Sequence, residues 1–282
     1  MATRVRDPDG PHPDLQRLGV KPSMRQYLAD IWAKRDFAWT VPMGELRAAH
    51  MNTVLGSAWH LLNPLLLAGV FYLVFGVFLG TDRGIDNFIA YLTVGILAFT
   101  FTQKSLAAGS RTIIANLPLI QSITFPRIVL PVSSVIGEAI AHVPALLTML
   151  AVALLTGEPL HWTWLLLLPA FGVQCLFNLG IALVSGRLTF HFRDTQQFLP
   201  FVTRLWMYLS AIFYSIDRIP EQARPWFEIN PAYLIITMHR DILLHQRADR
   251  EVWMMAAAWA VAAAVLGFFF FRGKESEYGR GY

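Results

Sequence analysis

Long uninterrupted apolar segments dominate this chain and predict helices that cross a membrane. A spanning α-helix needs about 20 apolar residues, and six segments meet or approach that length. The fifth is the weakest, because it is short and is flanked by Arg204. The pattern therefore predicts an all-α integral membrane fold of six transmembrane helices, at roughly residues 58–79, 88–109, 128–155, 162–185, 198–216 and 252–271.

A different pattern precedes the first span. In residues 24–39, apolar side chains recur at helical spacing and charged side chains take the opposite face, which predicts an amphipathic helix lying in the membrane interface. Packing on a soluble domain is disfavoured, because no soluble domain remains to receive the helix. We expect the helix to break at Thr40-Val41-Pro42, and a second helix to lead from about Glu45 into the first span.

Between the fifth and sixth spans, residues 217–251 are too apolar for a plain loop and too short for a span. We interpret them as a re-entrant outer helical hairpin, with two half-length helices hinged at Asn230-Pro231. Non-helical backbone at membrane depth is tolerated only against protein or a water-filled cavity. The hairpin therefore predicts a passage for it to line.

These patterns divide the chain into four parts, and charge orients them. The parts are a polar N-terminal tail at 1–23, the interface helix and the helix leading into the first span at 24–57, a six-span membrane domain at 58–272 and a C-terminal tail at 273–282. Segments expected on the inner side hold most of the 23 Lys and Arg residues, which predicts an inner-membrane protein with both termini cytoplasmic. The first 23 residues are polar and Pro-rich, so we expect no cleavable signal peptide.

Composition adds to this picture mainly by exclusion. Hydrophobic residues make up 55% of the chain and charged residues 15%, against about 25% charged in soluble domains. The closest approach to a phosphate loop, residues 267–275, has the wrong spacing and ends in Glu where Ser or Thr should bind magnesium. No metal motif accompanies it. We expect no enzyme activity, no cofactor or metal on this chain, and no nucleic-acid partner.

Two ionisable residues lie four apart in the third span, Glu138 and His142, and would share one helical face near mid-membrane. Such groups are costly in lipid and often functional. The alternative is a structural role in which Glu138 hydrogen-bonds a neighbouring helix, as Gln174 and Asn178 would do in the fourth span.

Aromatic side chains gather in the first and fifth spans. They are either lipid-facing bulk or the wall of a passage on which sugar rings can stack. If they form a passage, we expect it to be lined by Phe71, Phe75, Phe78, Trp206, Phe213 and Tyr214.

Two further groups are candidates for contacts at the inner face. The partly apolar segment 111–127 should dock on a partner protein through Asn116, Leu117, Pro118, Ile120, Phe125 and Arg127. Arg35 and Arg47 could meet a lipid diphosphate, because guanidinium groups pair bidentately with phosphate. They could equally extend toward the headgroups of membrane lipids.

Several segments together resemble the permeases of polysaccharide-exporting ATP-binding-cassette (ABC) transporters, the Wzm-type family of O-antigen, teichoic-acid and galactan exporters. A basic stretch precedes a motif matched by Thr53, Leu55, Gly56, Trp59, Leu62 and Pro64. A second motif is matched by Phe125, Pro126, Arg127, Leu130 and Pro131. Gly44 and Ala49 stand where that family usually has basic residues.

The resemblance implies a homodimer of six-span subunits, with the passage at the dimer axis. Two copies of an ABC ATPase would bind at segment 111–127 and would hold ATP and magnesium. The substrate would be a glycan on a polyprenyl diphosphate lipid, exported from the cytoplasm. Of the 23 basic residues most are Arg, which suggests a GC-rich actinobacterium and favours cell-wall galactan. Two alternatives remain open, an exporter of a small lipid or drug and a membrane-embedded polyprenyl-dependent glycosyltransferase.

Overall fold

The computed structural model describes residues 23–50, 59–78, 80, 85–123 and 125–278; some side chains between residues 37 and 76, and that of residue 276, are not described. The described residues are helical or lie in loops and turns, which confirms the all-α prediction. The main helices are α1 (Met24–Ala33), α2 (Arg35–His50), α3 (Trp59–Phe71), α4 (Phe88–Ala115), α5 (Leu117–Ser122), α6 (Val129–Leu155), α7 (Leu167–His191), α8 (Thr195–Tyr208), α9 (Arg224–Glu228), α10 (Pro231–Leu243) and α11 (Arg250–Gly273).

Four helical segments in the described part of the chain are long and apolar enough to cross a membrane. They are α4, α6, α11 and the segment Trp162–His191, which consists of a short 3-10 helix and α7. α3 continues as a π-helix over Tyr72–Phe78. α8 has 14 residues and stops at Tyr208, well short of the predicted end of the fifth span.

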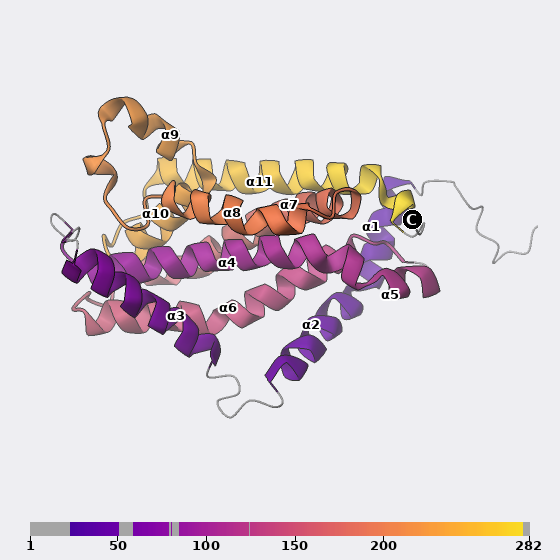
Figure 1. The fold of residues 1–282 in the computed structure, drawn as a ribbon, viewed down its shortest axis with the longest axis horizontal. Helices are drawn as coiled ribbons and strands as arrows, with labels where there is room; N and C mark the ends of the chain where they lie inside the picture. Colours follow the sequence, from indigo (N-terminus) through magenta and orange to yellow (C-terminus); the bar gives the residue numbers. More distant parts are fainter. Residues whose placement is uncertain (1–22, 51–58, 79, 81–84, 124, 279–282) are drawn as a thin grey trace, which may run out of the picture.

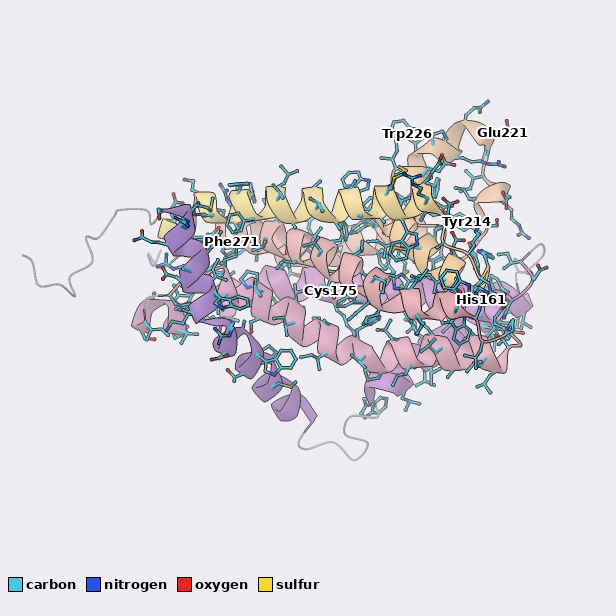
Figure 2. All side chains as sticks on the ribbon, turned by 180° about the vertical axis from the view of Figure 1, so that it is seen from behind. His161, Cys175, Tyr214, Glu221, Trp226 and Phe271 are labelled. Carbon is cyan, nitrogen blue, oxygen red and sulfur yellow. The ribbon has the colours of Figure 1, made fainter. Side chains whose placement is uncertain are left out.

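The long helices run side by side, so the bundle has two ends (Figure 1). At one end, called the α5 end here, lie α1, α5 and the last described residues, Glu275–Tyr278. At the other, the α9 end, the segment with α9 projects from the bundle. Figure 2 shows Glu221 and Trp226 on this projection and Tyr214 at its base.

α7 lies between α4 and α11, and small residues bring the three backbones close. A Cβ atom on Gly180 would lie 2.2 Å from the carbonyl carbon of Ala263 in α11, and one on Gly109 of α4 would lie 2.5 Å from the Ala182 Cβ. Glycine is therefore required at both positions. Such small-residue contacts are typical of helix packing in membranes.

Amide side chains add hydrogen bonds to the contact between α7 and α4. Gln174 Nε2 donates to the carbonyl of Ala98 (2.7 Å) and to Thr102 Oγ1 (3.1 Å), and Asn178 Nδ2 donates to Ser105 Oγ (3.2 Å). The structural role predicted for Gln174 and Asn178 is confirmed. Glu138, by contrast, makes no hydrogen bond to another helix within the described part of the chain.

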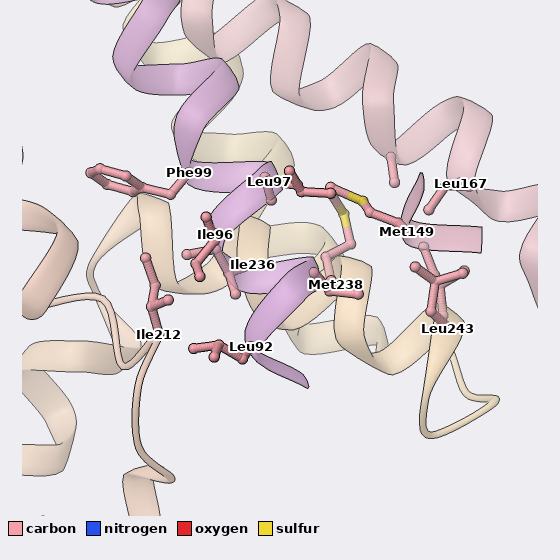
Figure 3. Close-up of a cluster of buried hydrophobic side chains, with 14 of the residues drawn as sticks. Leu92, Ile96, Leu97, Phe99, Met149, Leu167, Ile212, Ile236, Met238 and Leu243 are labelled. Atoms are coloured by element: carbon pink, nitrogen blue, oxygen red, sulfur yellow. The ribbon is translucent and has the colours of Figure 1, made fainter. Parts of the chain in front are cut away.

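The largest apolar core lies toward the α9 end, between α4, α6, α7 and α10 (Figure 3). Its centre includes fully buried residues from α4, α6 and α10. Among them are Leu92, Leu97, Met149, Met238 and Leu243. This core fixes α10 inside the bundle, whereas α9 lies outside it.

The N-terminal helices differ from the prediction at one point. The helix breaks at Lys34, and α2 continues through Thr40-Val41-Pro42, so the predicted break there was wrong. Pro42 is buried and lies against Gly137 of α6, where a Cβ would come 3.0 Å from the Pro42 Cβ. Packing against α6 therefore outweighs the local cost of a proline inside the helix.

The segment predicted as a re-entrant hairpin has a helix boundary at Asn230-Pro231, as expected. Its two arms are unequal, because α9 has 5 residues and α10 has 13. Asn230 begins α10 by accepting a hydrogen bond from the amide of Ala232 (3.1 Å).

Candidate functional site

The predicted ATPase-contacting segment surrounds α5. Asn116 precedes the helix and its Nδ2 donates to the carbonyl of Thr112 (2.8 Å). Ile120 is buried in a second apolar cluster at the α5 end, and Leu117 and Phe125 pack against that cluster. Because its side chain is inside this chain, Ile120 cannot also contact a partner, and the prediction for it is corrected. In α5 and directly after it, Pro118, Gln121, Ser122 and Ile123 are exposed.

Arg127 joins this segment to the C-terminal residues. Its backbone amide donates to Glu275 Oε1 (2.6 Å), and its guanidinium donates to the Glu275 carbonyl. Burial raises the pKa of the Glu275 carboxyl, and the neighbouring Glu275 charge adds to burial in raising the pKa of the Tyr27 hydroxyl from α1. Residues far apart in the sequence therefore meet at Glu275.

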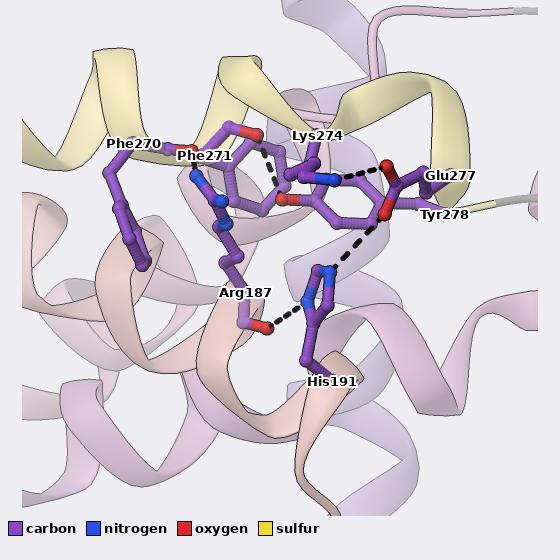
Figure 4. A network of polar contacts seen from close by, with 7 residues as sticks. All are labelled: Arg187, His191, Phe270, Phe271, Lys274, Glu277 and Tyr278. Carbon is purple, nitrogen blue, oxygen red and sulfur yellow. Dashed lines mark hydrogen bonds and ion pairs between the residues drawn. The ribbon is translucent and has the colours of Figure 1, made fainter.

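The rest of the C-terminal turn holds α7 and α11 together (Figure 4). Glu277 Oε2 lies 3.3 Å from His191 Nε2 at the end of α7, and the fully buried Tyr278 donates to the carbonyl of Phe271 (2.8 Å). The Arg187 guanidinium of α7 donates to the Phe270 carbonyl of α11. We call the contacts of Glu275, Glu277 and Tyr278 with Arg127, α7 and α11 the C-terminal clasp.

The predicted lipid-diphosphate residues lie on or near the N-terminal helices. Arg35 is exposed, with its guanidinium 5.3 Å from the centre of the Trp32 ring and its Nη1 donating to the Trp32 carbonyl (3.3 Å). Arg47 belongs to α2, but its side chain lies outside the described residues. The assignment of these two residues to a lipid diphosphate therefore remains a prediction.

The aromatic residues predicted to line the passage from the fifth span face the chain's own bundle. Trp206 Nε1 donates to Asn230 Oδ1 (2.8 Å), and the Trp206 ring packs edge-on against Phe99 of α4 with centroids 5.8 Å apart. Phe213 is buried in the main core. In this conformation Phe213 has no access to a passage between subunits, which corrects the prediction for it. Tyr214 is partly buried, and its hydroxyl donates to the Tyr208 carbonyl (2.6 Å).

The opposite side of α8 carries an exposed apolar stripe that we did not predict. Its residues recur at helical spacing along the whole helix. They are Phe198, Phe201, Val202, Leu205, Tyr208 and Leu209. In the first predicted span, formed by α3 and the π-helix after it, the side chains of Phe71 and Phe75 lie outside the described residues, whereas Phe78 is 73% exposed.

A buried arginine fixes the turn that ends α8, and sequence reasoning missed it. The Arg240 guanidinium of α10 donates to the carbonyls of Tyr91 (3.1 Å), Ala211 (3.0 Å) and Ile212 (3.0 Å), and lies 3.3 Å from the centre of the Tyr91 ring. Ala211 adopts a positive φ of 49°. Arg240 thus donates to buried carbonyls of the non-helical turn that follows α8 and ties this turn to α4. An isolated His-Arg-Asp triplet gives no local sign of this role.

Glu138 and His142 line one small cavity together with Thr100, Phe101 and Lys104 of α4. The His142 ring stacks on Phe101 with centroids 4.7 Å apart. Its Nε2 is buried without a hydrogen-bond partner in the described part of the chain. The predicted pair therefore shares its surroundings with a lysine that the sequence analysis had not connected to it.

Comparison with known proteins agrees with this arrangement. The family model described as ABC-2 type transporter matches residues 39–244. An O-antigen export system permease protein RfbA of Klebsiella pneumoniae is 27% identical over 80% of this chain and 87% of its own length. The protein of the same name from Myxococcus xanthus is 26% identical over 90% of this chain and 98% of its own length.

The matched region runs from α2 to the end of α10, so it includes α8, the Arg240 turn and the α5 segment. These findings confirm the resemblance to polysaccharide-exporting permeases. Members of the matched family form the membrane part of a transporter and are not themselves catalytic. Because the family model covers more than half of the sequence, this multi-pass inner-membrane chain belongs to the ABC-2 type transporter family.

Proposed function

We propose that this chain is the permease subunit of an ABC exporter that moves a polysaccharide linked to a polyprenyl diphosphate across the inner membrane. The observation that carries the proposal is the similarity to O-antigen export permeases, which extends over 71% to 90% of the chain. Cell-wall galactan is the preferred glycan, because the arginine-rich composition suggests a GC-rich actinobacterium.

A separate ATPase would power the export, with two copies binding ATP and magnesium. We place its contact at α5, using the exposed side of the segment around Pro118, Gln121 and Ile123. The C-terminal clasp supports this position, because Arg127 connects the segment to the α7 and α11 ends. Movement of α5 would then be transmitted to two of the long helices.

Two copies of the chain would form the passage, with six spans in each copy and both termini in the cytoplasm. The exposed stripe on α8 supports such a contact, because it combines aromatic and aliphatic side chains on one continuous face. The π-helix that follows α3, which includes the exposed Phe78, would contribute to the contact between the two copies beside α8. Trp206 and Tyr214 would support α8 from behind, and Phe71 and Phe75 keep their predicted place in the wall. The α9–α10 hairpin would enter the outer leaflet and close the passage.

Deletion of the gene tests the proposal. If the chain is an exporter, cells lacking it should accumulate full-length lipid-linked polymer inside and display none outside. Expression of the intact gene in the deleted strain should reverse both changes. A glycosyltransferase would leave no polymer in either place. An exporter of small lipids would leave polymer display unchanged, and either result would contradict the proposal.

A further inference from the structure

A groove lined by both polar and apolar side chains lies between α4 and α8, toward the α5 end, and the predicted contacts do not account for it. Its volume is about 260 Å³. Two cationic residues, Lys104 and Arg111, line it from α4, and Gln196 lines it from the start of α8. Deeper in the groove, Gln103 Nε2 donates to Thr203 Oγ1 (3.3 Å), which ties the two helices together.

The two cations share one face of α4, because they are seven residues or about two turns apart. Both are exposed, and neither has an ion-pair or hydrogen-bond partner in the described part of the chain. Lys104 lies about 16 Å along the helix from its end at Ala115, at a rise of about 1.5 Å per residue. If α4 spans the membrane, this places Lys104 within the hydrocarbon layer.

An unpaired cation at this depth is costly, so it should have a counter-charge. Glu138 lines the small cavity on the other side of Lys104, but no ion pair joins the two side chains. With Lys104 and Arg111 positive and Glu138 negative, the surroundings of the groove keep a net positive charge. The groove is therefore suited to an anion.

We propose that this groove binds the phosphate-bearing headgroup of a lipid. The Arg111 guanidinium can pair with phosphate oxygens through two hydrogen bonds, Lys104 supplies a second cation and Gln196 a neutral donor. The space suffices for a phosphate or diphosphate group, since one water takes about 30 Å³. The inference rests on the proposed function for its physiological ligand, a polyprenyl diphosphate; an anionic phospholipid of the bilayer presents the same chemistry.

Binding to the purified full-length chain in phosphatidylcholine nanodiscs tests the site. The probe is radiolabelled farnesyl diphosphate, a short polyprenyl diphosphate, and the variants are Lys104→Gln, Arg111→Gln and the double variant. Each single variant should weaken binding about tenfold and the double variant more. Lys104→Arg, which keeps the charge, should bind nearly as the parent does. The matched control is Arg204→Gln, which removes a cation next to Thr203 that does not line the groove, and it should leave binding unchanged.

Competition identifies the source of the phosphate. Displacement of the probe by inorganic pyrophosphate but not by phosphatidylglycerol indicates the diphosphate lipid, whereas equal displacement by phosphatidylglycerol indicates a bilayer lipid; both support the site. Equal binding by the parent and the double variant, or equal loss in Arg204→Gln, overturns it. Such a result would leave the proposed function standing if the gene-deletion experiment still shows intracellular polymer.

Discussion

α7 and α8 are consecutive helices, but the chain holds them in opposite ways. α7 packs between α4 and α11, with glycine contacts to both, amide hydrogen bonds to α4 and the clasp at its end. α8 packs by one face only, leaves an apolar stripe exposed and depends on Arg240 for the turn that ends it.

The difference indicates a division of labour within the subunit. A helix fixed on both sides can serve as the scaffold against which others move. A helix with one free apolar face and a single polar anchor is suited to meet another subunit or a substrate. We therefore propose that the transport surface lies on α8, beside the groove, rather than on α7.

The largest expected effect is at the anchor of α8. Arg240→Met keeps the bulk but leaves the buried Ile212 carbonyl without its donor, at a cost of about 1–3 kcal/mol, and removes one of the two donors to the Ala211 carbonyl. We expect the protein to lose about 3 kcal/mol of stability, seen as a large fall in the unfolding midpoint in detergent. Arg247→Met is the control, because it removes an exposed arginine that pairs with Asp241. Equal midpoints for the two variants would show that the anchor is dispensable.

A smaller effect is expected at the scaffold. Gly180→Ala would force α7 and α11 apart, since the added carbon meets the backbone of Ala263, and should cost about 2 kcal/mol. Gly172→Ala is the matched control on the same helix, because nothing lies within 4 Å of its added carbon. The measurement is the unfolding midpoint in detergent. A scaffold of the kind described here is contradicted if both variants melt like the parent.

The free face of α8 can be tested by cross-linking in membranes. In a Cys175→Ser background, a cysteine replacing Phe201 should form a disulfide-linked dimer on oxidation. One replacing Trp206 should not, because that side chain faces Phe99 and Asn230. Gel mobility with and without reductant distinguishes the species. Cross-linking through position 206 but not position 201 would contradict a subunit contact through the exposed stripe of α8.

The clasp should affect coupling more than folding. Arg127→Ala removes the guanidinium contact to the Glu275 carbonyl, and we expect ATP-driven export to fall several-fold while the ATPase stays bound. Lys274→Ala is the control, since it breaks only an exposed ion pair to Glu277 of little energetic value. Export rate and co-purification of the ATPase are measured together. If Arg127→Ala detached the ATPase, the result would indicate that Arg127 contacts the ATPase directly instead.

The smallest predicted effect is a pH dependence of the clasp. Burial raises the pKa of Glu275, with Tyr27, Arg127 and Arg272 as its charged or titratable neighbours. The native state therefore keeps this proton at a pH where the unfolded chain releases it, so stability falls as pH rises through that interval. Glu275→Gln should weaken this dependence of the unfolding midpoint. If the unfolding midpoint depended on pH equally in Glu275→Gln and in the parent, the pH dependence would belong to other groups.

Local patterns predicted the parts of the fold that depend on local chemistry. Apolar length located the four long helices, and the cost of an unpaired amide in an apolar helix correctly assigned Gln174 and Asn178 to helix contacts. The boundary at Asn230-Pro231 follows from proline's missing amide hydrogen. In contrast, the continuation of α2 through Pro42 depends on Gly137, almost a hundred residues away.

The site was harder to predict, because apolar side chains lie both on the bundle side and on the exposed side of α8. Counting aromatic residues selected Trp206 and Phe213, which face the bundle, over Phe201 and Leu205, which do not. The contact between Arg127 and Glu275 joins residues with no shared local pattern, and Arg240 reaches carbonyls from two other segments. Such contacts are set by tertiary packing and are visible only in the folded chain.

Reconstituted transport tests the central claim most directly, that this permease exports a lipid-linked polysaccharide. Proteoliposomes would contain the chain, its ATPase and labelled polymer on a polyprenyl diphosphate, with the ATP-binding side outside. We predict that ATP, but not a non-hydrolysable analogue, makes the polymer resistant to an external glycosidase, and that Lys104→Gln with Arg111→Gln slows this protection. Polymer that stays equally accessible with and without ATP, in vesicles whose ATPase is active, would contradict the claim.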